Sequence, residues 1–95
     1  MSSPLDPAIQ HDRKRARFQV SVESHQAHLE YREDNGRLVI THTEVPPAIG
    51  GKGIAAALVV AALEYARAGS MKVVPACEYA AMFMRRHGEY ADLLG

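Results

Sequence analysis

Three segments in the first half of the chain read as strands. Polar and apolar residues alternate through Arg17–Val22 and His28–Arg32, and a period of two is typical of strands with one buried face. Arg37–Thr43 reads as the third strand. Asp34-Asn35-Gly36 separates the last two segments, and Asn and Gly accept the positive φ of a tight hairpin. The pattern therefore predicts an antiparallel meander of three strands.

The pattern becomes helical in the second half of the chain. Ile54–Leu63 is apolar throughout, which predicts a helix that is buried around most of its circumference. The helical composition continues to Ala68, with Arg67 in the last turn and Gly69 just beyond it, as expected for a helix end.

Two shorter elements complete the predicted order. Met71–Pro75 reads as a fourth strand, parallel to the third because a helix connects them. Glu78–His87 reads as a second helix. The sequence thus predicts an α+β fold of order β-β-β-α-β-α with a mixed sheet. Residues 1–16 show no apolar period, so we expect a flexible tail before a domain of residues 17–95.

Composition narrows the class of protein. The 95 residues, 47% of them hydrophobic, suit one small globular domain. Lys and Arg balance Asp and Glu at 11 each, so charge gives no support for a nucleic-acid or membrane partner. The polar N-terminus and the single cysteine lead us to expect a cytoplasmic protein in a reducing compartment. A core of this size is compatible with a homodimer.

A glycine-rich stretch, Gly51–Ala55, precedes the long helix. Unpaired amides and the positive end of the helix dipole favour an anion there, so the stretch predicts a site for a phosphate-bearing cofactor. A Walker A loop is excluded, because Pro46 and Gly53 occupy positions that need Gly and Ser or Thr. The dinucleotide pattern G-x-G-x-x-A matches, but it follows an antiparallel meander and lacks the acidic residue about 20 positions later.

The loop and its flanks resemble the GCN5-related N-acetyltransferase superfamily. The family loop, Arg/Gln-x-x-Gly-x-Gly/Ala, aligns with Gly50–Ala55, and Gly50 stands where Arg or Gln is usual. His42-Thr43-Glu44-Val45-Pro46 and the later Cys77 match the small, minimal branch of the superfamily. The resemblance covers about residues 17–92, without the first helices that help longer members bind the acceptor.

The resemblance implies transfer of an acetyl group from acetyl-CoA to an amine of unknown identity. An alternative is a module that binds CoA or acyl-CoA without transfer, and a third is a purely structural partner-binding domain. The residues that we expect to contact the cofactor lie before, in and after the loop: Val45, Gly50, Gly51, Lys52, Gly53, Ile54, Ala55, Tyr79 and Arg86.

The expected catalytic residues are Cys77, Glu44 and His42. Cys77 lies immediately before a predicted helix, whose positive end stabilises a thiolate. Cys77 either takes the acetyl group as a thioester or only lines the site while the amine attacks directly. Glu44 or His42 could deprotonate the amine, and strict alternation puts these two on one face of the strand, opposite Thr41 and Thr43. Tyr79 and Tyr90 are candidates to protonate the leaving thiolate.

A metal site is not expected from the spacing of the histidines. His25-x-x-His28 lies where a loop enters a strand, and no Cys or acidic residue has metal-site spacing with the pair. We read the two histidines as a surface pair.

Overall fold

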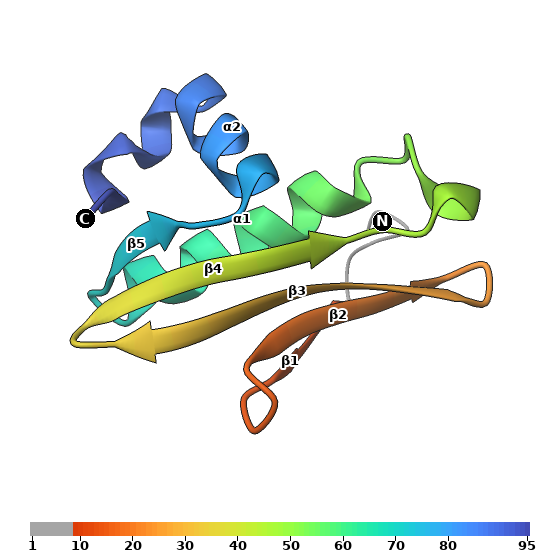
Figure 1. Cartoon of the computed structure of the whole chain (residues 1–95), viewed down its shortest axis with the longest axis horizontal. Coiled ribbons are helices and arrows are strands. Elements are labelled where there is room, and N and C mark those ends of the chain that lie inside the picture. Colours follow the sequence, from red (N-terminus) through yellow and green to blue (C-terminus); the bar gives the residue numbers. More distant parts are fainter. Residues whose placement is uncertain (1–8) are drawn as a thin grey trace.

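The fold is a mixed five-stranded sheet with its helices packed on one face (Figure 1). It was determined as a computed structural model, which describes residues 9–95. The strands are β1 (Gln10–Asp12), β2 (Arg17–Val22), β3 (His25–Asp34), β4 (Arg37–Glu44) and β5 (Lys72–Pro75), in that spatial order. Only β4 and β5 are parallel among these strands, so the predicted α+β class with its parallel crossover is confirmed.

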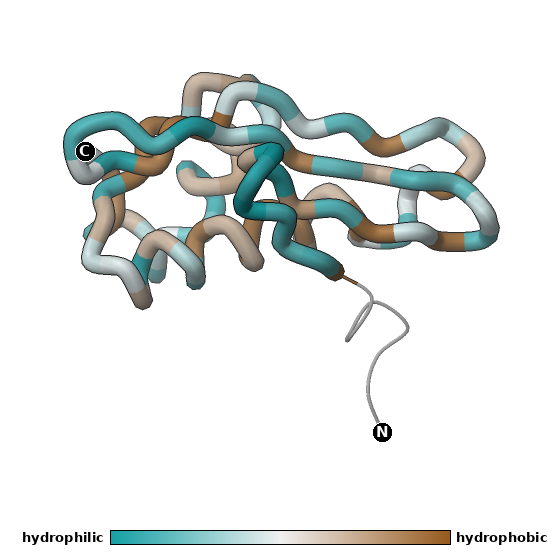
Figure 2. Tube along the Cα trace, turned by 90° about the horizontal axis from the view of Figure 1, so that it is seen from below, coloured by the Kyte–Doolittle hydropathy of each residue, from teal (hydrophilic) through white to brown (hydrophobic). Residues whose placement is uncertain are grey.

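The helical elements follow the predicted positions closely. Helix α1 spans Ile54–Ala68 and α2 spans Glu78–Arg86, while short 3₁₀ turns form at Pro47–Ile49 (η1) and Gly88–Leu93 (η2). Helix α1 lies behind the sheet in the view of Figure 1, and α2 lies beside β5. Hydrophobic and hydrophilic residues alternate along the strands (Figure 2), as a sheet covered on one face requires.

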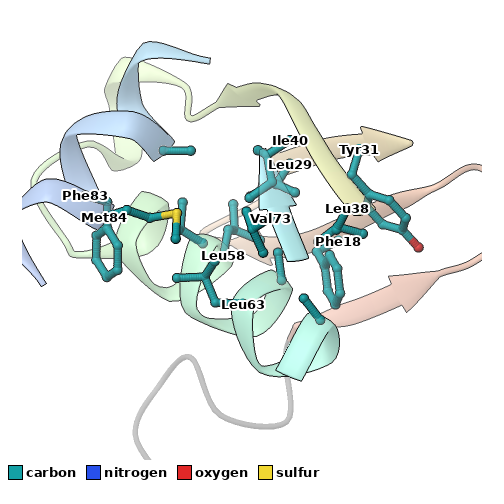
Figure 3. Close-up of a cluster of buried hydrophobic side chains, with 14 of the residues drawn as sticks. Phe18, Leu29, Tyr31, Leu38, Ile40, Leu58, Leu63, Val73, Phe83 and Met84 are labelled. Atoms are coloured by element: carbon teal, nitrogen blue, oxygen red, sulfur yellow. The ribbon is translucent and has the colours of Figure 1, made fainter. Parts of the chain in front are cut away.

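The core forms between α1, α2 and the inner face of the sheet (Figure 3). Leu58 and Leu63 of α1 are fully buried against Leu29, Leu38 and other strand residues. Burial of one such leucine contributes about 1.5–3 kcal/mol. This packing fixes where α1 starts, and therefore fixes the loop before it.

The N-terminal segment departs from the sequence prediction. Residues 1–16 were expected to form a flexible tail, but Gln10–Asp12 pairs with β2 as strand β1. The prediction is wrong for these residues, and its part over residues 1–8 lies outside the described chain. A strand of three residues is too short to show a period. It is held by tertiary contacts instead, since the His11 ring stacks on Phe18 with centroids 4.0 Å apart.

Strand β4 contains an irregularity that shapes the rest of the molecule. Tyr31 of β3 is opposite Ile40 and Glu30 is opposite His42, so Thr41 is an extra residue in β4. Such a bulge bends a strand and increases its twist. Pairing of β4 with β5 also ends at Ile40, opposite Pro75. The two parallel strands therefore separate just before His42.

His11 anchors β1 through an aromatic cluster. Its Nε2 shares a hydrogen bond with the Tyr31 hydroxyl, and Tyr65 lies edge-on to its ring. Burial lowers the pKa of His11 below 6.5, with the nearby Arg13 acting in the same direction. Burial also raises the pKa of Tyr31 to about 12. Both groups are therefore neutral at neutral pH.

We predict that protonation of His11 weakens the fold. Because the folded pKa is lowered, the unfolded chain takes up the proton first, so this stabilisation is complete above pH 6.5 and is lost as pH falls toward the folded pKa. His11→Phe keeps an aromatic ring against Phe18 but does not titrate. Urea unfolding between about pH 7 and pH 5 should therefore show a smaller loss of stability in the variant than in wild type. Equal losses would disprove the role of His11.

Candidate active site

The connection from β4 to α1 is a structured loop anchored in the core. Turn η1 is closed by a hydrogen bond from the Ile49 amide to the Pro46 carbonyl (3.0 Å), and the Gly50 amide bonds to the Pro47 carbonyl (3.1 Å). The Ile49 side chain is fully buried. The loop is therefore held at its centre, and the following glycines are presented at the start of α1.

Gly51 and Gly53 give the loop its shape. Both have φ of 77°, a left-handed conformation that costs other residues about 1–2 kcal/mol. A Cβ at either position would meet no described atom within 4 Å. The space beside the two glycines is thus open, which allows a ligand to approach the backbone closely.

Helix α1 begins without a compensating group among the described residues. Gly53 is its N-cap and offers no side chain, and the first turn contains no acidic residue. The first helical hydrogen bond runs from the Ala57 amide to the Gly53 carbonyl. The preceding amides, those of Ile54, Ala55 and Ala56, have no acceptor within the helix. They form a cluster of hydrogen-bond donors at the positive end of the helix dipole. Such an arrangement favours an anion.

A cavity of about 260 Å³ lies beside this helix start. Seven of the nine predicted cofactor residues line it, together with Ala56; the seven are Val45, Gly50, Gly51, Gly53, Ile54, Ala55 and Tyr79. Tyr79 comes from α2, so the cavity joins both helices to the end of β4. Burial raises the pKa of Tyr79, and its hydroxyl therefore keeps its proton at neutral pH.

The other two predicted cofactor residues do not line this cavity. Lys52 is exposed in the loop, and its Nζ lies 3.1 Å from the Glu23 carboxylate in the β2–β3 turn. Arg86 is exposed in the last turn of α2. Its neighbour Arg85, rather than Arg86, lines the adjoining hollow with Tyr79. Contact of Lys52 and Arg86 with a cofactor stays a prediction.

Cys77 lies where β4 and β5 separate. The amides of Ala76 and Cys77 both donate to the Ile40 carbonyl, at 2.9 and 3.1 Å. Cys77 is the N-cap of α2, and its Sγ accepts a hydrogen bond from the Ala80 amide at 3.4 Å. Thr43 Oγ1 lies 3.5 Å from the same sulfur. The thiol is therefore held by an amide donor of α2 and by a hydroxyl of β4 that can either donate or accept.

His42 and Glu44 share one face of β4, and their side chains are hydrogen-bonded at 3.2 Å. That face is the outer face of the sheet, which we define as the side turned away from α1. Thr43 pairs with the buried Leu29 and points to the opposite face, toward Cys77. The bulge at Thr41 causes this arrangement, because strict alternation from the buried Ile40 would turn His42 inward.

Thr43 is the site residue that sequence reasoning missed. The sequence pattern placed Thr43 on the face opposite His42 and Glu44, and it placed Cys77 after the next strand. Only the folded structure shows that Thr43 and Cys77 are in contact. Tyr90, the other candidate tyrosine, is buried in η2, and its hydroxyl donates to the carboxylate of Glu64 in α1 at 3.2 Å. Of the two tyrosines, Tyr79 alone lines the loop cavity.

These features define a class of protein: a small α+β domain with an uncapped, glycine-rich helix start and a gap between two parallel strands. A family model described as GCN5-related N-acetyl-transferase matches residues 17–93. The chain belongs to this family of acetyltransferases.

Relatives and a solved structure agree with this assignment. Protein NATD1 from Gallus gallus is 35% identical over 82 residues, which cover 83% of this chain and 74% of the relative. Protein NATD1 from Homo sapiens is 34% identical over the same share of this chain and 73% of its own length. The solution structure of a GCN5-like protein from Staphylococcus aureus superposes with a TM-score of 0.75 at 27% identity, over 99% of this chain and 91% of that one.

Within residues 9–95, no helix has both the length and the apolar character needed to cross a membrane.

We predict that Gly53→Ala lowers the free energy of unfolding by about 1–2 kcal/mol, because alanine must adopt the left-handed conformation at φ 77°. Gly88→Ala is the matched control, since a Cβ there meets no described atom within 4 Å and its φ is not positive. Urea denaturation of both variants measures the difference. Similar losses in both would contradict the assigned backbone constraint.

Proposed function

We propose that the protein transfers an acetyl group from acetyl-CoA to an amine. One observation supports this most directly: the start of α1, with its free amides and no acidic side chain in its first turn, opens onto the cavity lined by the two left-handed glycines and Tyr79. A diphosphate needs several N–H donors at a point that it can approach closely. Although Gly50 replaces the Arg or Gln usual in the family, the backbone supplies these donors.

The residues of the chain fit CoA beyond the diphosphate. Val45 lies at the end of β4, between the loop cavity and the point where β4 and β5 separate. An extended strand with unpaired backbone groups can bind the amides of a ligand as an added strand would. The pantetheine arm of CoA carries two such amides, so the gap after Ile40 suits it. The arm would direct the acyl group toward Cys77 and Thr43.

The side chains around the gap act on the reaction from the two faces of the sheet. Acetyl-CoA supplies an activated thioester, and the amine displaces its thiolate. Glu44, supported by His42 at 3.2 Å, lies on the outer face and accepts the proton that the amine loses. Tyr79, whose pKa is raised by burial, lines the cavity and donates a proton toward the departing sulfur.

Cys77 fits a lining role better than a covalent one. A nearby base or a helix start can activate a thiol nucleophile. Cys77 has only the helix start, because among the described residues the hydrogen-bond partners of its sulfur are the Ala80 amide and the Thr43 hydroxyl, and neither is a base. We therefore propose direct attack by the amine, with Cys77 shaping the acyl end of the site.

The alternative function is CoA binding without physiological transfer. The outer face beside Glu44 is exposed, and this favours the alternative because nothing in the described chain encloses an acceptor there. A thiol-release assay with acetyl-CoA and pooled amines separates the two functions. The alternative gives binding with no release above the rate without amine.

We predict that Gly53→Val lowers the affinity for CoA at least about tenfold, because its side chain enters the space that the diphosphate needs. Gly36→Val is the matched control: Gly36 has φ of 78° and an open Cβ position, but it lies in the β3–β4 turn at the other end of β4. Titration calorimetry measures both variants, with circular dichroism to verify folding. If Gly53→Val binds CoA as wild type does, the loop is not the diphosphate site.

We predict different outcomes for two variants beside the gap. Cys77→Ser should keep turnover within a few-fold of wild type, since direct transfer needs no thiolate, whereas Glu44→Gln should lose at least about a hundredfold in kcat. CoA affinity, measured by calorimetry, should change little in either. An acetylated Cys77 in the mass spectrum after incubation with acetyl-CoA, together with an inactive Cys77→Ser, would establish the covalent route instead.

A further inference from the structure

The outer face of the sheet brings together two histidines and a glutamate that are distant in sequence. His28 of β3 is directly opposite Glu44 of β4, and Glu30 is directly opposite His42. One ligand atom from each of His28, His42 and Glu44 lies within 4.8 Å of the other two. Strand register creates this cluster, and the bulge at Thr41 is what turns His42 outward to complete it.

The side chains of the cluster are already oriented by one another. His28 is the most buried of the three, with 18% of its side chain exposed, and its Nε2 is held 2.8 Å from the Glu30 carboxylate. The His42 ring lies with its centroid 5.8 Å from that of His28, and Glu44 is bonded to His42. A carboxylate on the other ring nitrogen of a ligating histidine is a regular companion of metal sites, so with Nε2 on Glu30 the site requires His28 to ligate through Nδ1.

The donor set selects a particular kind of ion. Two imidazole nitrogens and one carboxylate oxygen suit late first-row divalent ions, Zn²⁺ foremost, and not Mg²⁺ or Ca²⁺, which prefer oxygen alone. Three protein ligands leave one tetrahedral position for water on the exposed side. Zinc with bonds of about 2.0–2.2 Å needs its ligand atoms roughly 3.4 Å apart. The side chains of His42 and Glu44 are already 3.2 Å apart, so it is the separations from His28, which lie within 4.8 Å, that must shorten.

The local charge permits this ion. Arg17 of β2 has its Nη2 3.7 Å from the Glu30 carboxylate. Glu30 thus lies between Arg17 and the histidines, which leaves the charge of Glu44 available to the metal.

We propose that His28, His42 and Glu44 form a Zn²⁺ site that joins β3 to β4. The ion crosslinks the two strands beyond the bulge, close to where β4 leaves β5, and it stabilises the folded chain because the unfolded chain does not hold the three ligands together. This proposal does not depend on acetyl transfer, because metal binding is measured without any substrate.

The experiment uses the full chain without a histidine tag, stripped of metal by chelation. Calorimetry with ZnCl₂ should give one ion per chain, and the melting temperature should rise with Zn²⁺ and not with Mg²⁺. His28→Gln and Glu44→Gln should each weaken Zn²⁺ binding at least about tenfold. Glu44 is largely exposed, so its variant tests the site even if the His28 variant is unstable.

Two control variants identify competing sites. His25→Gln changes a histidine on the same strand that pairs with Val22 instead, and Cys77→Ser removes the single thiol. Both should bind Zn²⁺ with wild-type affinity. Loss of binding in either, unchanged binding in His28→Gln or Glu44→Gln, or an equal melting shift with Mg²⁺ would overturn the proposal.

Discussion

The separation of β4 from β5 after Ile40 is the constraint on which the rest of the site depends. The Ile40 carbonyl accepts hydrogen bonds from both Ala76 and Cys77, so pairing ends in a fixed geometry and not in a frayed edge. The same point is followed by the extra residue Thr41, which bends β4 away. The gap, the thiol at its edge and the direction of the loop toward α1 all follow from this one break in the sheet.

Helix α1 shows how the fold tolerates an unsatisfied helix start. A side-chain N-cap stabilises a helix by about 0.5–2 kcal/mol, and α1 has none. Its buried face more than compensates, since Ile54, Leu58 and Leu63 are almost fully inaccessible to water and each contributes about 1.5–3 kcal/mol. Ile54 is the first residue of the helix, so packing holds the free amides at a fixed place. The helix therefore needs neither a cap nor a ligand to keep its start in position.

Sequence patterns were sufficient for the elements that have a clear period. The bounds of α1 and β2 match the predicted bounds, because a long apolar run and a clean alternation each leave one interpretation. Strand β1 was missed, since three residues have no period and His11 is held by Phe18 and Tyr31 from elsewhere in the chain.

The sequence predicted the site residues that follow one another in the chain. It missed the contacts that form only when strands pair in a particular register. The loop residues from Gly50 to Ala55 were found from glycine spacing, and all but Lys52 line the cavity. Thr43 was not linked to Cys77, nor His28 to His42, because both contacts depend on the bulge at Thr41. Threonine is favoured in ordinary strands, so Thr41 gives no signal in the sequence that an extra residue lies there.

The outer face gives Glu44 and His42 two proposed roles that exclude each other at any one moment. A carboxylate oxygen and an imidazole nitrogen that ligate an ion have no free lone pair for the proton of an amine. A change at His28 distinguishes the two roles, because His28 belongs to the metal cluster but lies on β3, away from the gap between β4 and β5. Which role dominates then depends on the concentration of free ion relative to its dissociation constant. The exposed face beside the gap is thus the place where an acceptor and an ion would compete, while the loop cavity on the other side stays open to the cofactor.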